Sequence, residues 1–567
     1  MKLSSYILKN IRPYLVGVAA LMSAVLLDMI SPLITQSIVD DVIIGKNKDI
    51  LPMLLLGMLG IGIGRAVLGY TKEYCFDRNS SRIMVQLRRD VFHHIQTLSA
   101  EYFDRSNTGE LMARVKDDVD TIWDALSFVG MLTIEVVFHT GMIIFCMLRI
   151  DPLMTLIPFT GIVVCGITAI VMEKKLGDVY EQISDENAVL NRVAEENLGG
   201  VRTVRAFGRE RFEIQKFMSH NRRWRDLNLT QSRLFADGFP IFAAASGLVP
   251  ILVLPLGGYF VMKDRLTIGQ LSAFVQYSTN IVWPMQMLGW LVNSLSSASS
   301  SLGKLKAIFN EKPAVTECEE PVECPDIKGG IEFKNVCFHK ADGYEILHDI
   351  SFSVKPGETL GIMGATGAGK TSIIQLLQRM YDVTGGEILL DGVDIRKMKL
   401  GELRTAFGIV SQEVFLFSDR IMENISLGKK GNMPLDTVIR ASSEAQAKSF
   451  IERLGDRYDT VIGERGVGLS GGQKQMISIA RALSHDSPVL VLDDSTSALD
   501  METEHEIQKM LENKKGITRI IIAHRISAVR NADEIIVLDN GRIAERGTHE
   551  SLLSQNGLYR QTYDAQY

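Results

Sequence analysis

The sequence predicts two fold classes in one chain: an α-helical membrane domain, with six long transmembrane helices that extend into the cytoplasm, followed by an α/β domain. Apolar runs of membrane-spanning length crowd residues 14–300, whereas residues 328–567 have the pattern of a soluble α/β domain that opens with short β-type runs. The composition of the whole chain does not show this division: 46 % of the 567 residues are hydrophobic and 23 % are charged, which lies between the values typical of soluble and of membrane proteins. We place the membrane domain at residues 1–309, a linker at 310–328 and the α/β domain at 329–567.

Six segments have the roughly 20 apolar residues that a helix needs to cross a bilayer core of roughly 30 Å. The sixth is the least apolar of them. They cover residues 14–39, 51–72, 126–148, 153–172, 240–262 and 268–295. The start of the chain is polar and amphipathic and leads into a full-length span, which is not the pattern of a cleavable secretory signal. We therefore expect the first span to target the chain to the membrane.

Lysine and arginine are distributed unevenly between the connections. The connection after the second span carries seven of them and the connection after the fourth span carries twelve, whereas the three opposite connections together carry five. By the positive-inside rule the two long basic connections are cytoplasmic, and so are both termini. Few helix breakers interrupt these connections, and their apolar residues keep a helical spacing. We interpret them as membrane helices that continue into the cytoplasm as hairpins.

Net charge and cysteine content exclude some functional classes. The formal net charge of −6 gives no indication of a nucleic-acid partner. None of the six cysteines lies in a double pair with the spacing of a metal site. Cys318 and Cys324 in the linker are interpreted as free thiols, with a metal site as the weaker alternative.

A glycine-rich motif follows a predicted strand at 360–363 and opens a predicted helix at 372–380, which is the context that a phosphate-binding P-loop requires. It consists of Gly364, Ala365, Thr366, Gly367, Ala368, Gly369, Lys370, Thr371 and Ser372. Its glycines allow backbone N–H groups to close around phosphate oxygens, and the helix N-terminus adds positive charge. Lys370 would reach the β- and γ-phosphates, and the Thr371 hydroxyl would coordinate Mg²⁺. The α/β domain is therefore predicted to be a P-loop nucleotide-binding domain for ATP and Mg²⁺.

Two further motifs follow the P-loop. The apolar run 489–492 ends in Asp493, a Walker B arrangement in which the carboxylate holds Mg²⁺ through its shell. A second motif precedes this run and a predicted helix at 474–483. It consists of Leu469, Ser470, Gly471, Gly472 and Gln473. This pentapeptide, between a P-loop and a Walker B strand, resembles the signature of ATP-binding-cassette (ABC) proteins.

The resemblance to ABC exporters implies roles for residues around the ATP site. Gln412, after a predicted strand at 407–411, is similar to the Q-loop glutamine, which joins the Mg²⁺ ligands. His524 is similar to the switch histidine, which contacts the γ-phosphate. Each ATP site of the family's dimers joins one chain's P-loop and Walker B strand to the other chain's signature. Ser470 would therefore face the nucleotide of a partner chain.

The resemblance extends over essentially the whole chain. Residues 497–500 resemble the D-loop, and residues 464–466 resemble the X-loop, which touches the membrane domain. In the membrane half, residues 102–110 and 199–210 resemble the two intracellular loops, whose short coupling helices dock onto the ATPase domains.

Two positions depart from the family's pattern. Asp494 stands where exporters usually have a Glu that orients or deprotonates the attacking water, and its carboxylate is one methylene shorter. The expected adenine-stacking aromatic is also missing, because Lys340, or His339 if one counts back from the P-loop, holds that position, with Tyr344 as the nearest substitute. A local backbone shift could compensate for Asp494. The other reading is that the chain resembles the degenerate-site subunit of bacterial heterodimeric multidrug exporters of the Lmr/Bmr type.

Ionisable residues inside the spans are candidates for substrate contact, because they are costly against lipid. They are Asp28 in the first span, Arg65 in the second, and the Glu135/His139 pair one turn apart in the third. Trp290, in a tryptophan- and methionine-rich part of the sixth span, is a further candidate. The alternative is that the ionisable residues pair for structural reasons and that Trp290 only packs.

The expected function is that of one subunit of an ATP-driven exporter in a bacterial plasma membrane. ATP hydrolysis would move drugs or other hydrophobic or amphipathic small molecules out of the cytoplasm or the inner leaflet, with a second ABC half-transporter and membrane lipid as partners. A heterodimer is favoured by Asp494 beside an intact Ser470. A homodimeric exporter or lipid flippase is the alternative, and an ATP-gated regulatory membrane protein is a third.

Overall fold

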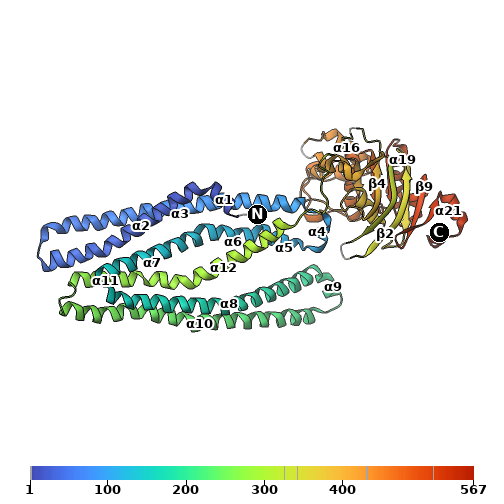
Figure 1. The fold of residues 1–567 in the computed structure, drawn as a ribbon. Helices are drawn as coiled ribbons and strands as arrows, with labels where there is room; N and C mark the ends of the chain where they lie inside the picture. Colours follow the sequence, from blue (N-terminus) through green and yellow to red (C-terminus); the bar gives the residue numbers. More distant parts are fainter. Residues whose placement is uncertain (1–2, 325, 341–342, 430–431, 515, 567) are drawn as a thin grey trace. The chain divides into compact units, whose positions relative to one another are not determined.

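The computed structural model describes residues 3–324, 326–340, 343–429, 432–514 and 516–566, and it divides into two compact units (Figure 1). The first unit comprises residues 1–96 and 107–311. The second comprises residues 97–106 and 312–567. The division places the short segment 97–106 of the membrane half with the α/β unit.

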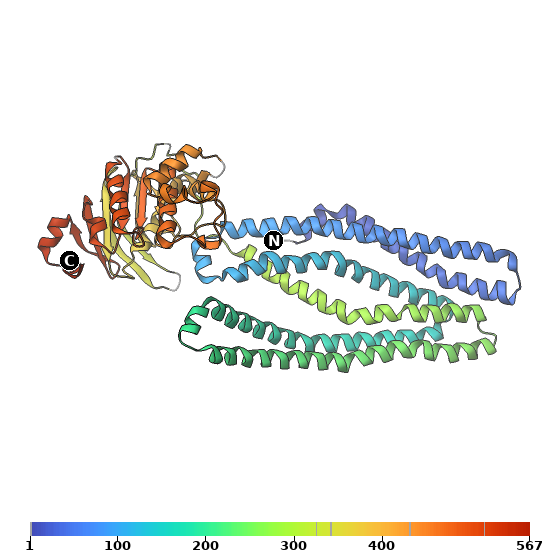
Figure 2. The same cartoon turned by 180° about the vertical axis from the view of Figure 1, so that it is seen from behind.

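The first unit is entirely helical over its described residues (Figures 1 and 2). Its helices are α1 (Leu3–Lys9), α2 (Ile11–Ser37), the π-helix η1 (Ile38–Ile44), η2 (Lys48–Ile50), α3 (Leu51–Thr97), α5 (Thr108–Ala113), η3 (Arg114–Asp118), α6 (Val119–Asp124), η4 (Ala125–Val129), α7 (Gly130–Ile150), α8 (Pro152–Gly199), α9 (Val201–Ala206), α10 (Glu210–Met262), α11 (Ile268–Asn280) and α12 (Val282–Asn310). Helices α3, α8 and α10 contain 47, 48 and 53 residues, more than twice the length of a membrane span. The prediction that the spans continue as long helices is confirmed.

Five helical stretches among the described residues are long and apolar enough to cross a membrane. The sixth predicted span, 268–295, differs because it is broken into α11 and α12 at Ile281. Pro284 lies in the first turn of α12, has no N–H to donate, and would place its ring against the carbonyl of Asn280 in a continuous helix. The proline therefore explains why α11 ends at Asn280.

Within this unit, α8 and α10 lie side by side as an antiparallel pair joined through α9 (Figures 1 and 2). A buried apolar cluster links α8 and α10 to α7, α11 and the start of α12, and Met154, Val253, Phe274 and Tyr277 are at its centre. The Tyr277 hydroxyl donates to the carbonyl of Met29 at 2.6 Å, so α11 is also fixed to α2.

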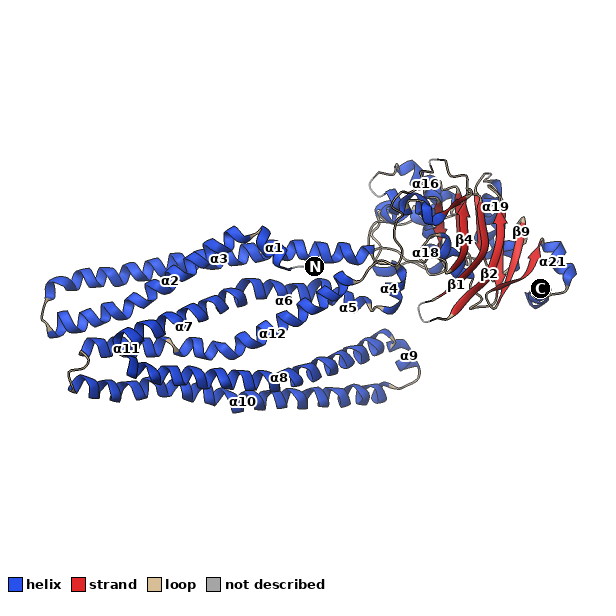
Figure 3. Cartoon of the chain, viewed as in Figure 1, coloured by secondary structure: helices blue, strands red, loops and turns tan. Residues whose placement is uncertain are grey.

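The second unit is an α/β domain with two sheets (Figure 3). One sheet is antiparallel, with strand order β2-β1-β4-β5; the other has the order β10-β9-β3-β8-β7-β6 and is parallel except for β10. The strands are β1 (Ile331–His339), β2 (Glu345–Val354), β3 (Thr359–Gly364), β4 (Gly385–Leu390), β5 (Val393–Asp394), β6 (Phe407–Val410), β7 (Val489–Asp493), β8 (Thr518–Ile522), β9 (Glu534–Asp539) and β10 (Arg542–Gly547). All five residues of β7 are buried, as expected for a strand inside a parallel sheet.

Helices surround these sheets (Figure 3). They are α4 (Ala100–Arg105), α13 (Lys370–Leu377), η5 (Ile395–Lys397), α14 (Leu400–Thr405), α15 (Ile421–Ile425), η6 (Leu427–Lys429), α16 (Leu435–Glu444), α17 (Lys448–Ile451), η7 (Arg457–Asp459), η8 (Glu464–Gly466), α18 (Gly471–Ser484), α19 (Met501–Asn513), α20 (Ile526–Val529), α21 (His549–Gln555) and α22 (Leu558–Gln566). In a parallel sheet the carboxyl ends of the strands share one edge. The ends of β3, β7 and β8 therefore bring Gly364, Asp493 and the residues after Ile522 to the same edge.

Candidate nucleotide site and transmembrane cavity

The turn between β3 and α13 has a backbone that only glycine accommodates well. Gly364 has φ +148°, and a Cβ there would lie 2.4 Å from the carbonyl oxygen of Leu538; Gly369 has φ +94°, and a Cβ there would lie 2.6 Å from Leu347 Cδ2. Lys370 begins α13 and folds back over the turn, where its Nζ donates to the carbonyls of Gly364 at 2.8 Å and Ala365 at 2.9 Å. The predicted strand, glycine-rich turn and helix are all present.

Opposite charges meet behind this turn. Burial lowers the pKa of Lys370, and the nearby carboxylates of Asp493 and Asp494 partly offset that effect. Burial raises the pKa of Asp493; hydrogen bonding from Thr371 and the charges of Lys370 and His524 oppose the rise. The P-loop lysine, both aspartates and the histidine thus lie within electrostatic reach of one another.

The residues predicted to hold Mg²⁺ are partly assembled. The Thr371 hydroxyl donates to Asp493 Oδ2 at 3.3 Å, which brings two hard oxygen donors together at the end of β7. Mg²⁺ in phosphate sites is bound by one or two such protein oxygens together with substrate phosphates and water, so this pair fits the ion. Gln412, the third predicted ligand, is exposed in the segment after β6.

Asp494 has a left-handed backbone, with φ +43°. Its N–H donates to the carbonyl of Ile522 at 2.9 Å, which fixes the residue against the end of β8. The Ser497 hydroxyl donates to the Asp494 carbonyl at 3.0 Å. Aspartate and asparagine are enriched in this region of φ/ψ space because their short polar side chains tolerate it. The position therefore suits an aspartate locally.

The signature motif forms the N-terminus of α18. Ser470 is the N-cap, its Oγ accepts from Gln473 N at 3.3 Å, and Gln473 Oε1 accepts from Ser470 N at 2.9 Å. This capping box leaves the N–H groups of Gly471 and Gly472 at the open end of the helix, where an anion is favoured. Leu469 precedes the cap and is half-buried. The motif can bind phosphate by its backbone.

The residues that the resemblance associates with adenine lie at and after the end of β1. Tyr344 is 71 % exposed. Lys340 Nζ lies 3.5 Å from Asp104 Oδ2 of α4, and the Tyr381 hydroxyl donates to the same oxygen at 2.7 Å. Tyr381 packs against Phe338 of β1, with ring centroids 5.5 Å apart. Tyr381, which was not singled out from the sequence, shares the Asp104 carboxylate with Lys340.

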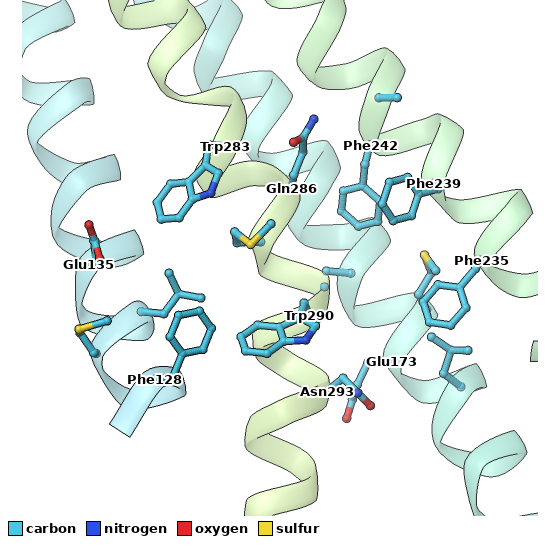
Figure 4. Close-up of a pocket in the computed structure, with 18 of the residues that line it drawn as sticks. Phe128, Glu135, Glu173, Phe235, Phe239, Phe242, Trp283, Gln286, Trp290 and Asn293 are labelled. Carbon is cyan, nitrogen blue, oxygen red and sulfur yellow. The ribbon is translucent and has the colours of Figure 1, made fainter. Parts of the chain in front are cut away.

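The helical unit contains a cavity of about 830 Å³ (Figure 4). Figure 4 shows Trp283, Gln286, Trp290 and Asn293 of α12 between two walls. Phe128 and Glu135 lie on one side; Phe235, Phe239 and Phe242 of α10 lie on the other. Phe128 and Trp290 make an edge-to-face contact, with centroids 5.7 Å apart. The lining is mainly aromatic and apolar, with a few carboxylates.

The membrane-embedded ionisable residues separate into two groups. Glu135 lines the cavity, but its Oε2 lies 2.5 Å from Lys72 Nζ, which lines the same cavity. Asp28 is outside the cavity lining and pairs with Arg65 and with His139, whose Nε2 lies 3.1 Å from Asp28 Oδ2. This arrangement favours the alternative in which Asp28 and His139 pair for structural reasons and do not contact the substrate.

Glu173 and Lys72 also line the cavity and were not singled out from the sequence. Glu173 Oε1 accepts from the Ser296 hydroxyl at 3.1 Å, and among the described residues it makes no ion pair. Both residues lie at the ends of predicted spans, where charged residues are common. Their facing position depends on how the helices pack, which the sequence pattern does not give.

Comparison with known proteins gives matches over both units. The model of the ABC transporter transmembrane region matches residues 14–285, and the ABC transporter model matches residues 347–497. The putative multidrug export ATP-binding/permease protein YgaD of Bacillus subtilis is 34 % identical over 547 residues, which cover 94 % of this chain and 93 % of YgaD. An ATP-dependent lipid A-core flippase of Haemophilus influenzae is 35 % identical over 546 residues, which cover 94 % and 91 % of the two chains.

A solved structure matches the whole chain. It is that of a bacterial Atm1-family ABC exporter with ATP bound; the TM-score is 0.85 at 28 % identity, and the match covers 100 % of this chain and 98 % of the other.

Proposed function

The chain belongs to the ABC transporter family as an exporter subunit, with its transmembrane region fused to its ATPase domain, and on this premise we propose that it exports hydrophobic or amphipathic small molecules as the slow-site member of a heterodimer. The proposal is carried by two features together: Asp494, which is fixed after β7 with φ +43°, and the complete signature cap that Ser470 forms at the start of α18. The chain would lack a fast hydrolytic site of its own but would complete that of its partner.

The carboxylate length supports the slow-site assignment. Asp494 ends one methylene earlier than the glutamate usual at this position, and a misplacement of about 1 Å can cost about 10²-fold in rate. The backbone of Asp494 is held by the Ile522 carbonyl, so the chain does not shift freely to compensate. A homodimeric exporter or a lipid flippase is the second candidate, because the flippase relative is 35 % identical over nearly the whole chain.

The residues around the P-loop have separate proposed roles in binding and hydrolysing ATP. Lys370 and the turn N–H groups would bind the phosphates, and His524 would contact the γ-phosphate. Thr371 and Asp493, with Gln412, would hold Mg²⁺, which when bound neutralises charge on the β- and γ-phosphates. Asp494 would orient the attacking water imperfectly. Ser470, Gly471 and Gly472 would donate to the γ-phosphate bound by the partner.

Exposed apolar side chains support a dimer. In the helical unit, Leu198 and Phe207 flank α9 and are 75 % and 77 % exposed. In the α/β unit, Phe415, Val461 and Val467 are also exposed. We assign these exposed side chains to contacts with a partner subunit. We propose that α9 of each subunit docks onto the ATPase domain of the other, and that both termini are cytoplasmic.

The cavity is the proposed substrate site. Its aromatic lining suits a flat apolar body. Glu173, which makes no ion pair within the described part of the chain, suits a positive group. Glu135 is already neutralised by Lys72. ATP-driven closure of the two ATPase domains would turn this cavity from the inner to the outer side of the membrane.

The test compares the purified chain alone with the chain co-expressed with a second ABC half-transporter of the same organism, one that has glutamate after its Walker B aspartate. The single chain is expected to hydrolyse ATP slowly, and the pair is expected to hydrolyse it rapidly and to be stimulated by a transported amphiphile. Robust, substrate-stimulated ATPase activity from the single chain would contradict the heterodimer and favour the homodimeric alternative.

A further inference from the structure

Helix α22 lies beside the loop that carries His524. This loop, residues 523–525, connects β8 to α20. A cavity of about 440 Å³ opens between the loop and α22, and Gly364, Ala365, His524 and Gln566 are among its lining residues. The last turn of α22 therefore borders the same space as the start of the P-loop.

Both ends of α22 are fixed. At its start, the Glu545 carboxylate of β10 accepts from the N–H groups of Leu558 and Tyr559, the latter at 3.0 Å. Tyr559 is 1 % exposed and belongs to an apolar cluster that also contains Ala523 and Ile526. The residues on either side of His524 and Arg525 thus pack in the same small core as α22.

At the end of α22, Gln566 bonds directly to the histidine loop. Its Nε2 donates to the carbonyl of His524 at 2.7 Å, and its Oε1 accepts from the N–H of Ile526 at 3.0 Å. One primary amide therefore satisfies a backbone acceptor and a backbone donor two residues apart. This geometry restrains the two peptide planes on either side of Arg525, the first of which begins at the His524 carbonyl. The His524 side chain itself is exposed.

We propose that Gln566 is a positioning residue, which holds the backbone of the histidine loop so that the His524 imidazole is presented to the γ-phosphate. The proposal rests on the role given to His524 in the proposed function. Gln566 acts only through His524, so it should affect ligands that carry a γ-phosphate and not those that lack one.

The experiment uses the full chain without a partner, so that only this chain's P-loop is present. The affinities for a non-hydrolysable ATP analogue and for ADP, both with Mg²⁺, are measured for wild type, Gln566→Met, His524→Ala and the double variant. Gln566→Met keeps the side-chain length but loses both hydrogen bonds, and it should weaken binding of the ATP analogue roughly three- to tenfold. Binding of ADP should stay within about twofold of wild type.

The double variant gives the decisive comparison. If Gln566 works through His524, the double variant should bind the ATP analogue no more weakly than His524→Ala alone, because the two effects share one cause. Gln555→Met, the same replacement at an exposed position of α21 outside this cavity, is the control and should leave both affinities unchanged. A second variant, Gln566→Glu, keeps the acceptor for Ile526 N but opposes the His524 carbonyl with another acceptor, so it should lose at least as much as Gln566→Met.

The possible failures are distinguishable. Equal losses of affinity for the ATP analogue and for ADP would show that α22 only stabilises the domain. Unchanged affinities in Gln566→Met, together with a selective loss in His524→Ala, would show that the histidine loop keeps its conformation without Gln566. Either result overturns the proposal. If His524→Ala does not weaken the ATP analogue selectively, the role of His524 in the proposed function is wrong, and the proposal for Gln566 is overturned with it.

Discussion

Gln475 of α18 bonds to Ala498, since its side-chain Oε1 accepts from the Ala498 N–H at 3.0 Å. Its Nε2 also donates to the Ser497 hydroxyl at 3.4 Å. The signature helix is thereby joined to the segment that follows Asp494 by one glutamine that is 5 % exposed. In the proposed dimer, Ser470 contacts the nucleotide bound by the partner, and Asp494 acts on the nucleotide bound by this chain. Gln475 therefore connects the elements that carry the residues of two different ATP sites.

We expect Gln475→Leu to destabilise the domain and to slow ATP turnover by the assembled dimer. The hydrogen bond to the Ala498 N–H is partly buried, and loss of such a bond costs about 0.5–1.5 kcal/mol. Thermal unfolding measures the first effect, and steady-state ATPase activity measures the second. Gln555→Leu, at an exposed position of α21, is the control. If Gln475→Leu lowered stability but left the turnover of the folded dimer unchanged, the link between α18 and residues 497–498 would be structural only.

Ser470→Arg and Lys370→Ala should have unequal effects in the assembled dimer. Lys370→Ala removes the P-loop ammonium group and should weaken nucleotide binding in this chain's site but leave partial turnover, because the faster site uses the partner's P-loop. Ser470→Arg destroys the signature cap and should abolish turnover. Nucleotide binding and ATPase activity are measured on both variants. Equal losses would indicate two equivalent sites and hence a different dimer.

The cavity predicts a charge preference. Glu173→Gln preserves the acceptor for the Ser296 hydroxyl but removes the negative charge, so a cationic amphiphile should bind about tenfold more weakly while a neutral one of similar size is unaffected. Trp290→Ala should weaken both, because it removes the ring that contacts Phe128. Fluorescence titration of the two ligands measures the difference. A similar loss for both ligands in Glu173→Gln would show that the carboxylate is not a counter-charge.

Stability should depend on pH through His485, which follows α18. Its half-buried imidazole accepts from the Gly428 N–H at 3.3 Å through Nε2, so the neutral form is the bound one. Burial, and then the positive charge of Lys429, lower the pKa of His485 below 6.5. The unfolded chain therefore takes up the proton first as the pH falls through about 6.5, and the stability present above that pH is progressively lost below it.

His485→Gln tests this assignment, because glutamine can accept from Gly428 but does not titrate. Unfolding temperatures measured from about pH 7.5 to about pH 5.5 should fall less steeply for the variant than for the wild type. Identical slopes would mean that other groups determine the acid sensitivity.

The local motifs could be predicted from the sequence because each is a short-range pattern. The buried run of β7 ending in Asp493, and the turn from Gly364 to Lys370, depend on residues adjacent in the chain and on backbone conformations that few residues allow. The carboxyl ends of parallel strands then bring them to one edge. The fold class of both units followed from hydrophobic patterning in the same way.

Pairings between distant elements could not be predicted from the sequence. Lys72 meets Glu135 across two helices, and Asp28 meets Arg65 and His139, because of helix rotation and packing. Tyr381 packs against Phe338 and donates to Asp104, two contacts between residues far apart in the chain that no local pattern indicates. Pro284 is a sequence signal for the helix break at Ile281. The prediction of one continuous span relied instead on the apolar length of residues 268–295.

The carboxylate of Asp494 is one methylene shorter than that of the glutamate usual at this position. Replacing it by glutamate restores the methylene that the hydrolytic site of the family usually has, so Asp494→Glu should raise ATP cleavage at this site. The gain should be less than about tenfold, because the carboxylate must come within about 3 Å of the water while other groups also have to be in place. The left-handed backbone at this position further limits the gain in rate, since glutamate is less favoured than aspartate in that backbone conformation.

The measurement is single-turnover ATP cleavage in a dimer whose partner has its own catalytic glutamate replaced by glutamine, so that the background from the faster site is removed. Asp494→Asn in the same dimer is the control, because it keeps the length of aspartate without its charge. No change in Asp494→Glu would mean that the opposing signature, or nucleotide positioning near Lys340, limits this site. A rate below that of wild type would mean that the site is built around aspartate, in keeping with its backbone, and the slow-site assignment would then be wrong.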